Sequence, residues 1–245
     1  MKLAYETSWP PAPDAIHLKN DLYVRFDVSL LPDAALIASL PTSITPILCY
    51  PGATITPARM SAEALAGIQK SHEAWVIALK NQGFLRMVVA ADNDGAYQKL
   101  LSPRFSEKAL SERMAPLLTT FAALYQEIPE LMVMLCVEEF APGGLDATDG
   151  IATSLALAEL GLKEIIATAG TRDFMPLYNR RMTQKKRTQE EGFYSNEPSL
   201  ACALWLKEHT DLAVYCAGFF DDEAKALILA QELGLSGIIQ RLSEI

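Results

Sequence analysis

The chain alternates short apolar runs with longer amphipathic stretches, and this pattern restricts the fold more than any other feature. The apolar runs predict strands at 22–28, 45–50, 86–92, 131–137, 164–169, 212–217 and 237–242. The amphipathic stretches between them predict helices at 61–82, 107–127, 147–161, 198–209 and 221–234. Alternation of this kind is typical of parallel strands joined by crossover helices. We therefore expect an α/β fold with a parallel sheet.

The segment 32–40 fits two structures. Pro32 followed by Asp33 suits the start of a helix, whereas the apolar residues after them suit a short strand. A strand here brings the number of strands to eight, which completes a (β/α)8 TIM barrel; a helix leaves seven and a partial barrel. We predict the strand, and a single TIM-barrel domain over 1–245, because 245 residues is a usual length for one barrel.

The two ends of the chain predict an incomplete outer wall. The first 50 residues are too few for full-length helices between the early strands, and the chain stops at Ile245, directly after the last predicted strand. We therefore expect abbreviated early βα units and no closing C-terminal helix. Apolar strand surface left bare in this way needs a cover, so we predict a homo-oligomer or a partner subunit over the wall.

The acidic balance of the chain argues against two classes of partner. The net charge is −9, which repels nucleic acid and anionic membranes. No apolar stretch approaches the ~20 residues that span a bilayer, and we predict a cytoplasmic protein without membrane contact. The cysteines are widely spaced and fit free thiols in a reducing compartment rather than a zinc site; they are Cys49, Cys136, Cys202 and Cys216.

One basic segment stands out in this acidic chain. Six of the 21 basic residues fall within 172–187, after the predicted strand 164–169. Arg172, Arg180 and Arg181 could capture an anionic ligand or an acidic partner if the segment covers the end of the barrel. The alternative is a solvated charge run with no partner.

Other candidates for chemistry are weaker. Asp92, Asp94, Glu138 and Glu139 follow strands and could bind a metal or act as an acid/base pair, but such loop carboxylates are more often solvated, and we predict no metal site. The histidines lie away from strand ends, so a histidine base is not expected.

From about residue 60 onward the chain resembles the old yellow enzyme family of FMN-dependent NAD(P)H oxidoreductases. The segments that carry the resemblance are 60–63, 81–84, 94–95, 101–103, 138–144, 217–219 and 240–241, with weaker likeness at 17–20 and 50–52. The resemblance implies a TIM barrel with its active site at the C-terminal ends of the strands. It also implies that FMN takes hydride from NAD(P)H and passes it to a small molecule that carries an activated alkene.

The resemblance assigns roles to particular residues. Gly218 and Arg241, with Ala217 and Gln240 beside them, match the two phosphate-loop signatures for FMN. Asn93 matches a substrate anchor, and Tyr97 lies close to the position of the proton-donating tyrosine of the family, which itself falls on Gly95.

Three positions depart from the family pattern. Ala90 replaces a residue that hydrogen-bonds the substrate carbonyl, and Met134 and Ile47 replace an arginine and a glutamine that face the flavin. Two hypotheses follow: an FMN-dependent oxidoreductase with an altered site, or a non-catalytic barrel that serves as a subunit or as a module binding a ligand or partner.

Overall fold

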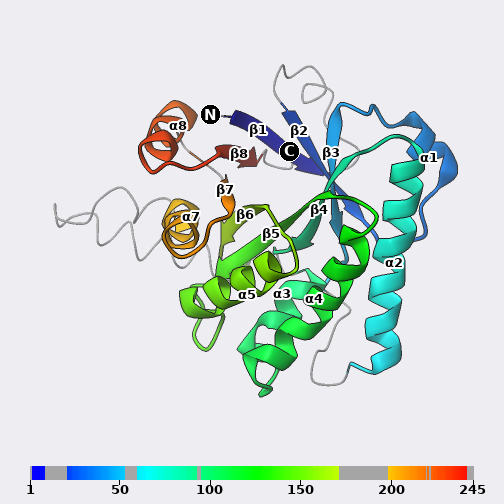
Figure 1. The fold of residues 1–245 in the computed structure, drawn as a ribbon, viewed down its shortest axis with the longest axis horizontal. Coiled ribbons are helices and arrows are strands. Elements are labelled where there is room, and N and C mark those ends of the chain that lie inside the picture. Colours follow the sequence, from blue (N-terminus) through cyan, green and yellow to red (C-terminus); the bar gives the residue numbers. More distant parts are fainter. Residues whose placement is uncertain are drawn as a thin grey trace.

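The strands form one parallel sheet that curls round and closes on itself (Figure 1). In this computed structural model, residues 2–8, 21–52, 60–92, 95–170, 198–218, 220 and 222–241 are described. The strands are β1 Lys2–Ser8, β2 Asp21–Asp27, β3 Ile44–Cys49, β4 Arg86–Ala91, β5 Glu130–Glu138, β6 Glu164–Ala169, β7 Ala213–Gly218 and β8 Gly237–Arg241. Each strand pairs with the next one, and β1 pairs with β8 through Ala4 opposite Ile239. This is the strand arrangement of a TIM-like barrel.

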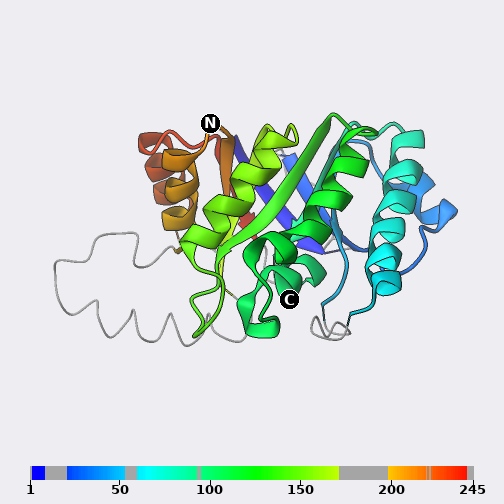
Figure 2. The same cartoon turned by 60° about the horizontal axis from the view of Figure 1, so that its bottom comes forward.

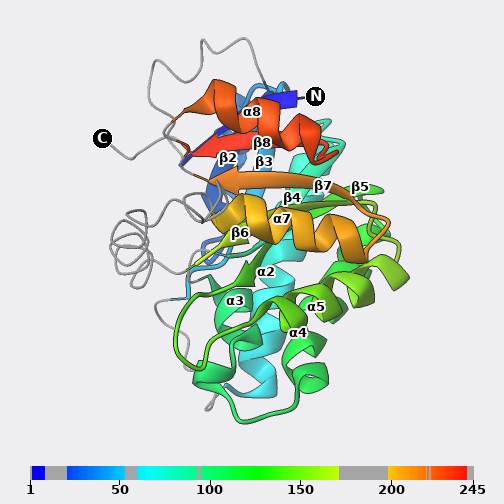
Figure 3. The same cartoon turned by 90° about the vertical axis from the view of Figure 1, so that its left-hand side faces the viewer.

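Helices cover the outside of this sheet. The longer ones are α2 Ala62–Asn81, α4 Leu110–Tyr125, α5 Ala147–Glu159, α7 Pro198–His209 and α8 Glu223–Glu232. Figure 3 shows α8, α7 and α5 in succession along the outer surface. The short α3 Ala96–Leu101 lies at one end of the barrel, between β4 and α4 (Figure 2). In the described part of the chain, no helix combines the length and the apolar character needed to cross a membrane.

The prediction of a strand at 32–40 is wrong. Residues Ala34–Ser39 form the helix α1, whose first turn is capped by Asp33: its carboxylate accepts hydrogen bonds from the backbone N–H groups of Ala35 and Leu36, at 2.7 and 2.9 Å. This cap satisfies backbone donors that a strand would have to pair elsewhere. The eighth strand is β1 instead, in a segment for which the sequence predicts no element.

The prediction of short early units is met by α1, which has only 6 residues. The connection between β1 and β2, at 9–20, and the segment 242–245 after β8 lie outside the described residues. The expected absence of a closing helix therefore stays a prediction.

Apolar residues fill both sides of the sheet. The larger core lies between the sheet and the helices, and a smaller one fills the inside of the barrel. Successive residues of a strand point to opposite faces, so alternate positions of each strand supply the inner core. Its members are Ala4, Tyr23, Ile47, Val88, Ala90, Met132, Met134, Ile166, Tyr215, Ala217 and Ile239.

The outer face of β2 is covered by the chain's own helices. Val24 and Phe26 are buried, and the ring of Phe26 lies 5.6 Å from that of Trp75 in α2. The indole Nε1 of Trp75 donates a hydrogen bond of 2.8 Å to the carbonyl of Leu30, which fixes the turn after β2. At this strand the wall needs no second subunit. An oligomer remains a prediction.

His72 predicts a loss of stability in mild acid. It is fully buried in α2, its Nδ1 lies 2.9 Å from the carbonyl oxygen of Ile68, and the rings of Tyr50 and Tyr97 lie 6.5 and 5.3 Å from its own. Burial lowers the pKa of His72 from 6.5 to about 4. Between pH 6.5 and about 4, the imidazole of His72 is protonated in the unfolded chain but stays neutral in the folded chain. The free energy of unfolding should therefore fall by about 3 kcal/mol between pH 6.5 and 4.

Urea unfolding at intervals across this pH range measures the effect. In His72→Leu the fall should be largely absent, whereas His209→Gln, a change at an exposed histidine, should keep it. An unchanged slope in His72→Leu would show that another group is responsible.

Candidate site at the mouth of the barrel

Four charged side chains meet inside the barrel at the C-terminal ends of the strands. They come from β1, β2, the residue directly after β4, and β8, and we call them the mouth ring: Glu6, Arg25, Asp92 and Arg241. The strand period explains why they converge. Each lies two positions after a residue of the inner core, and these residues are Ala4, Tyr23, Ala90 and Ile239.

Each carboxylate of the mouth ring bridges both arginines. Arg25 donates from Nε and Nη2 to Glu6 Oε1 at 3.0 and 2.8 Å, and from Nη1 and Nη2 to Asp92 Oδ1, both at 3.1 Å. Arg241 donates from Nε to Glu6 Oε2 at 2.9 Å and from Nη2 to Asp92 Oδ2. Two positive and two negative groups give the ring a formal charge of zero.

Mutual attraction keeps Glu6, Arg25 and Arg241 ionised despite their burial. Burial by itself would raise the pKa of Glu6, but Arg241 and Arg25 hold it at about 2. Burial opposes the charge of Arg25 too, yet Asp92 and Glu6 raise its pKa well above the usual value. The pKa of Arg241 is raised in the same way, by Glu6 and Asp92 against burial. Glu6, Arg25 and Arg241 are therefore held in their charged forms in a medium where unpaired charges are very costly.

An apolar floor lies beneath the mouth ring. The Sδ atom of Met134 is 3.2 Å from Arg25 Nη2 and 3.5 Å from Arg241 Nη2. Ile47 and Ala90 belong to the same inner core and are also buried. The three positions where the sequence departs from the old yellow enzyme pattern therefore line the inside of the barrel, and none of them offers a charged group or a strong hydrogen-bond donor.

The structure brings together some of the residues that the sequence singles out for phosphate. Gly218 ends β7 opposite Gln240, so it lies beside Arg241 at the mouth. Ala217 faces the inner core. Gln240 makes a different connection: its Oε1 accepts from the backbone N–H of Phe220 at 3.1 Å, and its Nε2 donates to the carbonyl of Arg241 at 3.1 Å. Gln240 thus ties β8 to the segment after β7.

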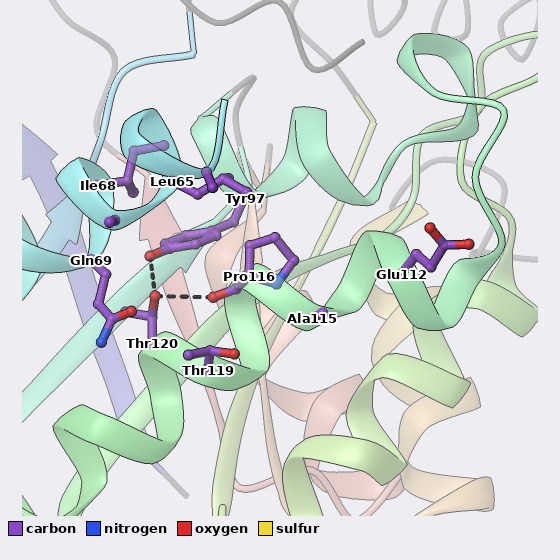
Figure 4. A pocket seen from close by; sticks show the side chains of 11 residues that line it. Leu65, Ile68, Gln69, Tyr97, Glu112, Ala115, Pro116, Thr119 and Thr120 are labelled. Carbon is purple, nitrogen blue, oxygen red and sulfur yellow. Dashed lines mark hydrogen bonds between the residues drawn. The ribbon is translucent and has the colours of Figure 1, made fainter. Parts of the chain in front are cut away.

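The structure does not place Tyr97 in the mouth ring. This residue lies in α3, is buried, and donates a hydrogen bond of 2.8 Å to Thr120 Oγ1, which in turn donates to the carbonyl of Pro116 at 3.0 Å (Figure 4). It lines a cavity of about 340 Å³ between α2 and α4, on the outer wall. Burial raises its pKa, so its proton is held tightly. Asn93, Arg172, Arg180 and Arg181 lie outside the described residues.

A third buried carboxylate, that of Glu139, has a structural role. Glu139 accepts hydrogen bonds from Ser102 Oγ at 2.7 Å, from the backbone N–H of Leu145 at 3.2 Å and from Gln98 Nε2 at 3.2 Å. It joins the segments 101–103 and 138–144, two of those that carry the family resemblance. Within the described ranges, no group of three or more His, Cys, Asp or Glu side chains could hold a metal ion.

Sequence reasoning missed Glu6 and Arg25. A signal for Arg25 was present, because it is the one charged residue within the apolar run 22–26. It lies two positions after Tyr23, so both side chains point to the same face of the strand. A charge inside such a run needs a buried partner. The signal for Glu6 was weaker, since β1 itself was not recognised.

The fold and the mouth ring define the class of protein: a parallel α/β barrel with its charged groups gathered at the C-terminal ends of the strands. No protein-family model and no curated protein sequence matches the chain. Solved structures do share its fold, at low sequence identity.

Three of them are oxidoreductases by name. A 2-naphthoyl-CoA reductase in complex with 2-naphthoyl-CoA has a TM-score of 0.66 and 12% identity, over 89% of this chain and 42% of its own. The 6-hydroxypseudooxynicotine amine oxidase of Pseudomonas geniculata N1 has a TM-score of 0.61 and 16% identity, over 91% of this chain and 34% of its own. Morphinone reductase in complex with tetrahydroNAD has a TM-score of 0.55 and 12% identity, over 93% of this chain and 64% of its own. This chain thus spans less than two thirds of each. The matches show that the barrel fold is shared with these structures.

Proposed function

We propose that the protein is a flavin-dependent oxidoreductase whose cofactor and small-molecule substrate bind at the mouth of the barrel. The observation that carries this proposal is the position of Gly218 and Arg241, side by side at the C-terminal ends of β7 and β8. Parallel barrels hold their ligands at this end. The fold shared with two reductases and an amine oxidase supports the same reaction class. FMN and NAD(P)H are the cofactor and reductant that the family resemblance implies.

The residues present fit FMN at its phosphate end. Arg241 has the fork of donors that suits a phosphate, and Gly218, where a side chain would meet Ser199 and Phe220 on the outer side of the sheet, would contribute its backbone. Because Arg241 already binds Glu6 and Asp92, it can contact a phosphate fully only by giving up part of these bonds. Bound FMN would supply the hydride chemistry. The chain would hold its phosphate at the mouth, and the buried Ile47 and Met134 would exclude water below it.

Binding of FMN is the direct test. We expect the protein to quench the fluorescence of added FMN and to show flavin absorbance after gel filtration. Arg241→Ala should weaken binding by about 1–3 kcal/mol, because a charge-assisted contact is lost. Lys80→Ala, which changes an exposed lysine on α2, should have no effect. If Arg241→Ala and the wild type bind FMN with equal affinity, Arg241 does not contact the phosphate.

A second candidate function rests on the mouth ring itself. The charges of the ring balance one another and the floor below it is apolar, so the inside of the barrel needs no cofactor to neutralise or fill it. This arrangement suits a non-catalytic binding module or subunit. A folded, colourless protein that leaves FMN fluorescence unchanged would favour this function over the first.

A further inference from the structure

We propose that Arg25 also binds the anionic group of the ligand, a phosphate or a carboxylate, in addition to the contact with Arg241 proposed above. This inference rests on the mouth being the ligand site, as proposed above, but it assigns the contact to a strand that carries no part of the family resemblance.

Accessibility separates Arg25 from the other members of the ring. Its side chain is 14% exposed, against 9% for Arg241, 6% for Glu6 and 0% for Asp92. Both carboxylates are thus more deeply buried than the Arg25 guanidinium. Although the ring is neutral as a whole, Arg25 is therefore its most exposed charged side chain. Because Coulomb energy falls with distance, the nearest charge makes the largest single contribution to the attraction of an ion.

The remaining neighbours of Arg25 are weak acceptors that an anion can replace. Nη2 lies 3.2 Å from Met134 Sδ, and Arg25 partly offsets the rise that burial causes in the pKa of the Cys49 thiol. Sulfur accepts hydrogen bonds poorly, whereas a charged oxygen accepts them well. Within the described part of the chain, Nη1 makes one hydrogen bond to a carboxylate, with Asp92. A guanidinium has two N–H groups on this nitrogen.

The two carboxylates make Arg25 a prepared site. They hold Nε, Nη1 and Nη2 from two sides, so the guanidinium plane is fixed before any ligand arrives. Binding then costs little side-chain entropy. Glu6 and Asp92 are positioning residues in this scheme, and Arg25 makes the contact.

The other end of the barrel provides a matched control. Arg86 begins β4 and contacts Met132 Sδ at 3.2 Å, as Arg25 contacts Met134, and it pairs with Glu164 at the start of β6. It is an arginine of the same kind, placed at the N-terminal ends of the strands and far along the barrel from the mouth. Arg86→Met should leave ligand binding at the mouth unchanged.

Calorimetric titration of the full chain tests the proposal. The probes are inorganic phosphate, acetate, FMN and riboflavin; the first two distinguish the oxyanions, and riboflavin is FMN without its phosphate. Arg25→Met should weaken phosphate and FMN binding by about tenfold or more, because a charged hydrogen bond is lost. Riboflavin binding should change little, and Arg25→Lys should fall in between. Tighter binding of acetate than of phosphate would assign the contact to a carboxylate.

Because Arg25→Met leaves two buried carboxylates with one arginine, the double variant Glu6→Gln/Arg25→Met is the decisive one: it keeps the ring neutral. If this variant, folded by circular dichroism, binds phosphate and FMN as the wild type does, the role of Arg25 is overturned and the proposed function stands. If the wild type binds phosphate through Arg25 but never binds FMN, the proposed function fails and Arg25 keeps its role. A wild type that binds no oxyanion overturns the inference.

Discussion

Asp92→Ala is expected to lower the free energy of unfolding by about 3–5 kcal/mol, because removing one partner of a buried ion pair leaves its counter-charge buried and uncompensated. Asp92 is fully buried and accepts hydrogen bonds from Arg25 and Arg241. Its loss leaves two guanidinium groups to share the single carboxylate of Glu6. Urea unfolding followed by circular dichroism measures the change.

A salt bridge on the surface provides the comparison. Lys80 Nζ and Glu127 Oε2 are 2.8 Å apart, but their side chains are 46% and 49% exposed. Glu127→Ala should therefore cost at most about 1 kcal/mol. If both substitutions cost the same, the mouth ring would be shown to be hydrated, with water replacing the lost carboxylate.

Trp75→Ala should cost about 3–5 kcal/mol, since it opens a large cavity between α2 and the sheet. The indole is almost fully buried against Phe26 and donates a hydrogen bond to the carbonyl of Leu30. Trp75→Phe keeps most of the apolar volume and should cost less than Trp75→Ala. The same urea experiment measures both.

Ile77, in the same helix but 50% exposed, is the control: Ile77→Ala should change stability by no more than about 0.5 kcal/mol. A large cost at Ile77 together with a small one at Trp75 would mean that the outer face of α2, rather than its inner face, is buried in solution. That result would point to the oligomer that the sequence predicts.

Periodicity was enough to find the strands that are apolar on both faces. The predicted runs 86–92 and 131–137 agree closely with β4 Arg86–Ala91 and β5 Glu130–Glu138, because burial on both sides leaves an almost uninterrupted apolar segment. Around β1 the same reasoning fails. Lys2 and Glu6 interrupt the short run there, and Glu6 is acceptable inside the barrel only because two arginines neutralise it.

The segment 32–40 shows a limit of a different kind. Its apolar residues fit a strand and a helix equally well, and the cap at Asp33 decides for the helix. The site residues divide in a similar way. Sequence alone could place Arg241 at a strand end, but it could not show that the ring partners come from residues 6, 25 and 92, since such contacts depend on how the barrel closes.

The contact between Glu6 and Arg241 joins residues 235 positions apart, and the same two strands complete the sheet. During synthesis β1 emerges long before β8, and its second neighbour is available only after residue 241 has left the ribosome. Until then both edges of the growing sheet are open, and such edges can pair with the wrong strand. Correct folding of this chain therefore depends on the last strand arriving before the exposed edge of the first finds another partner.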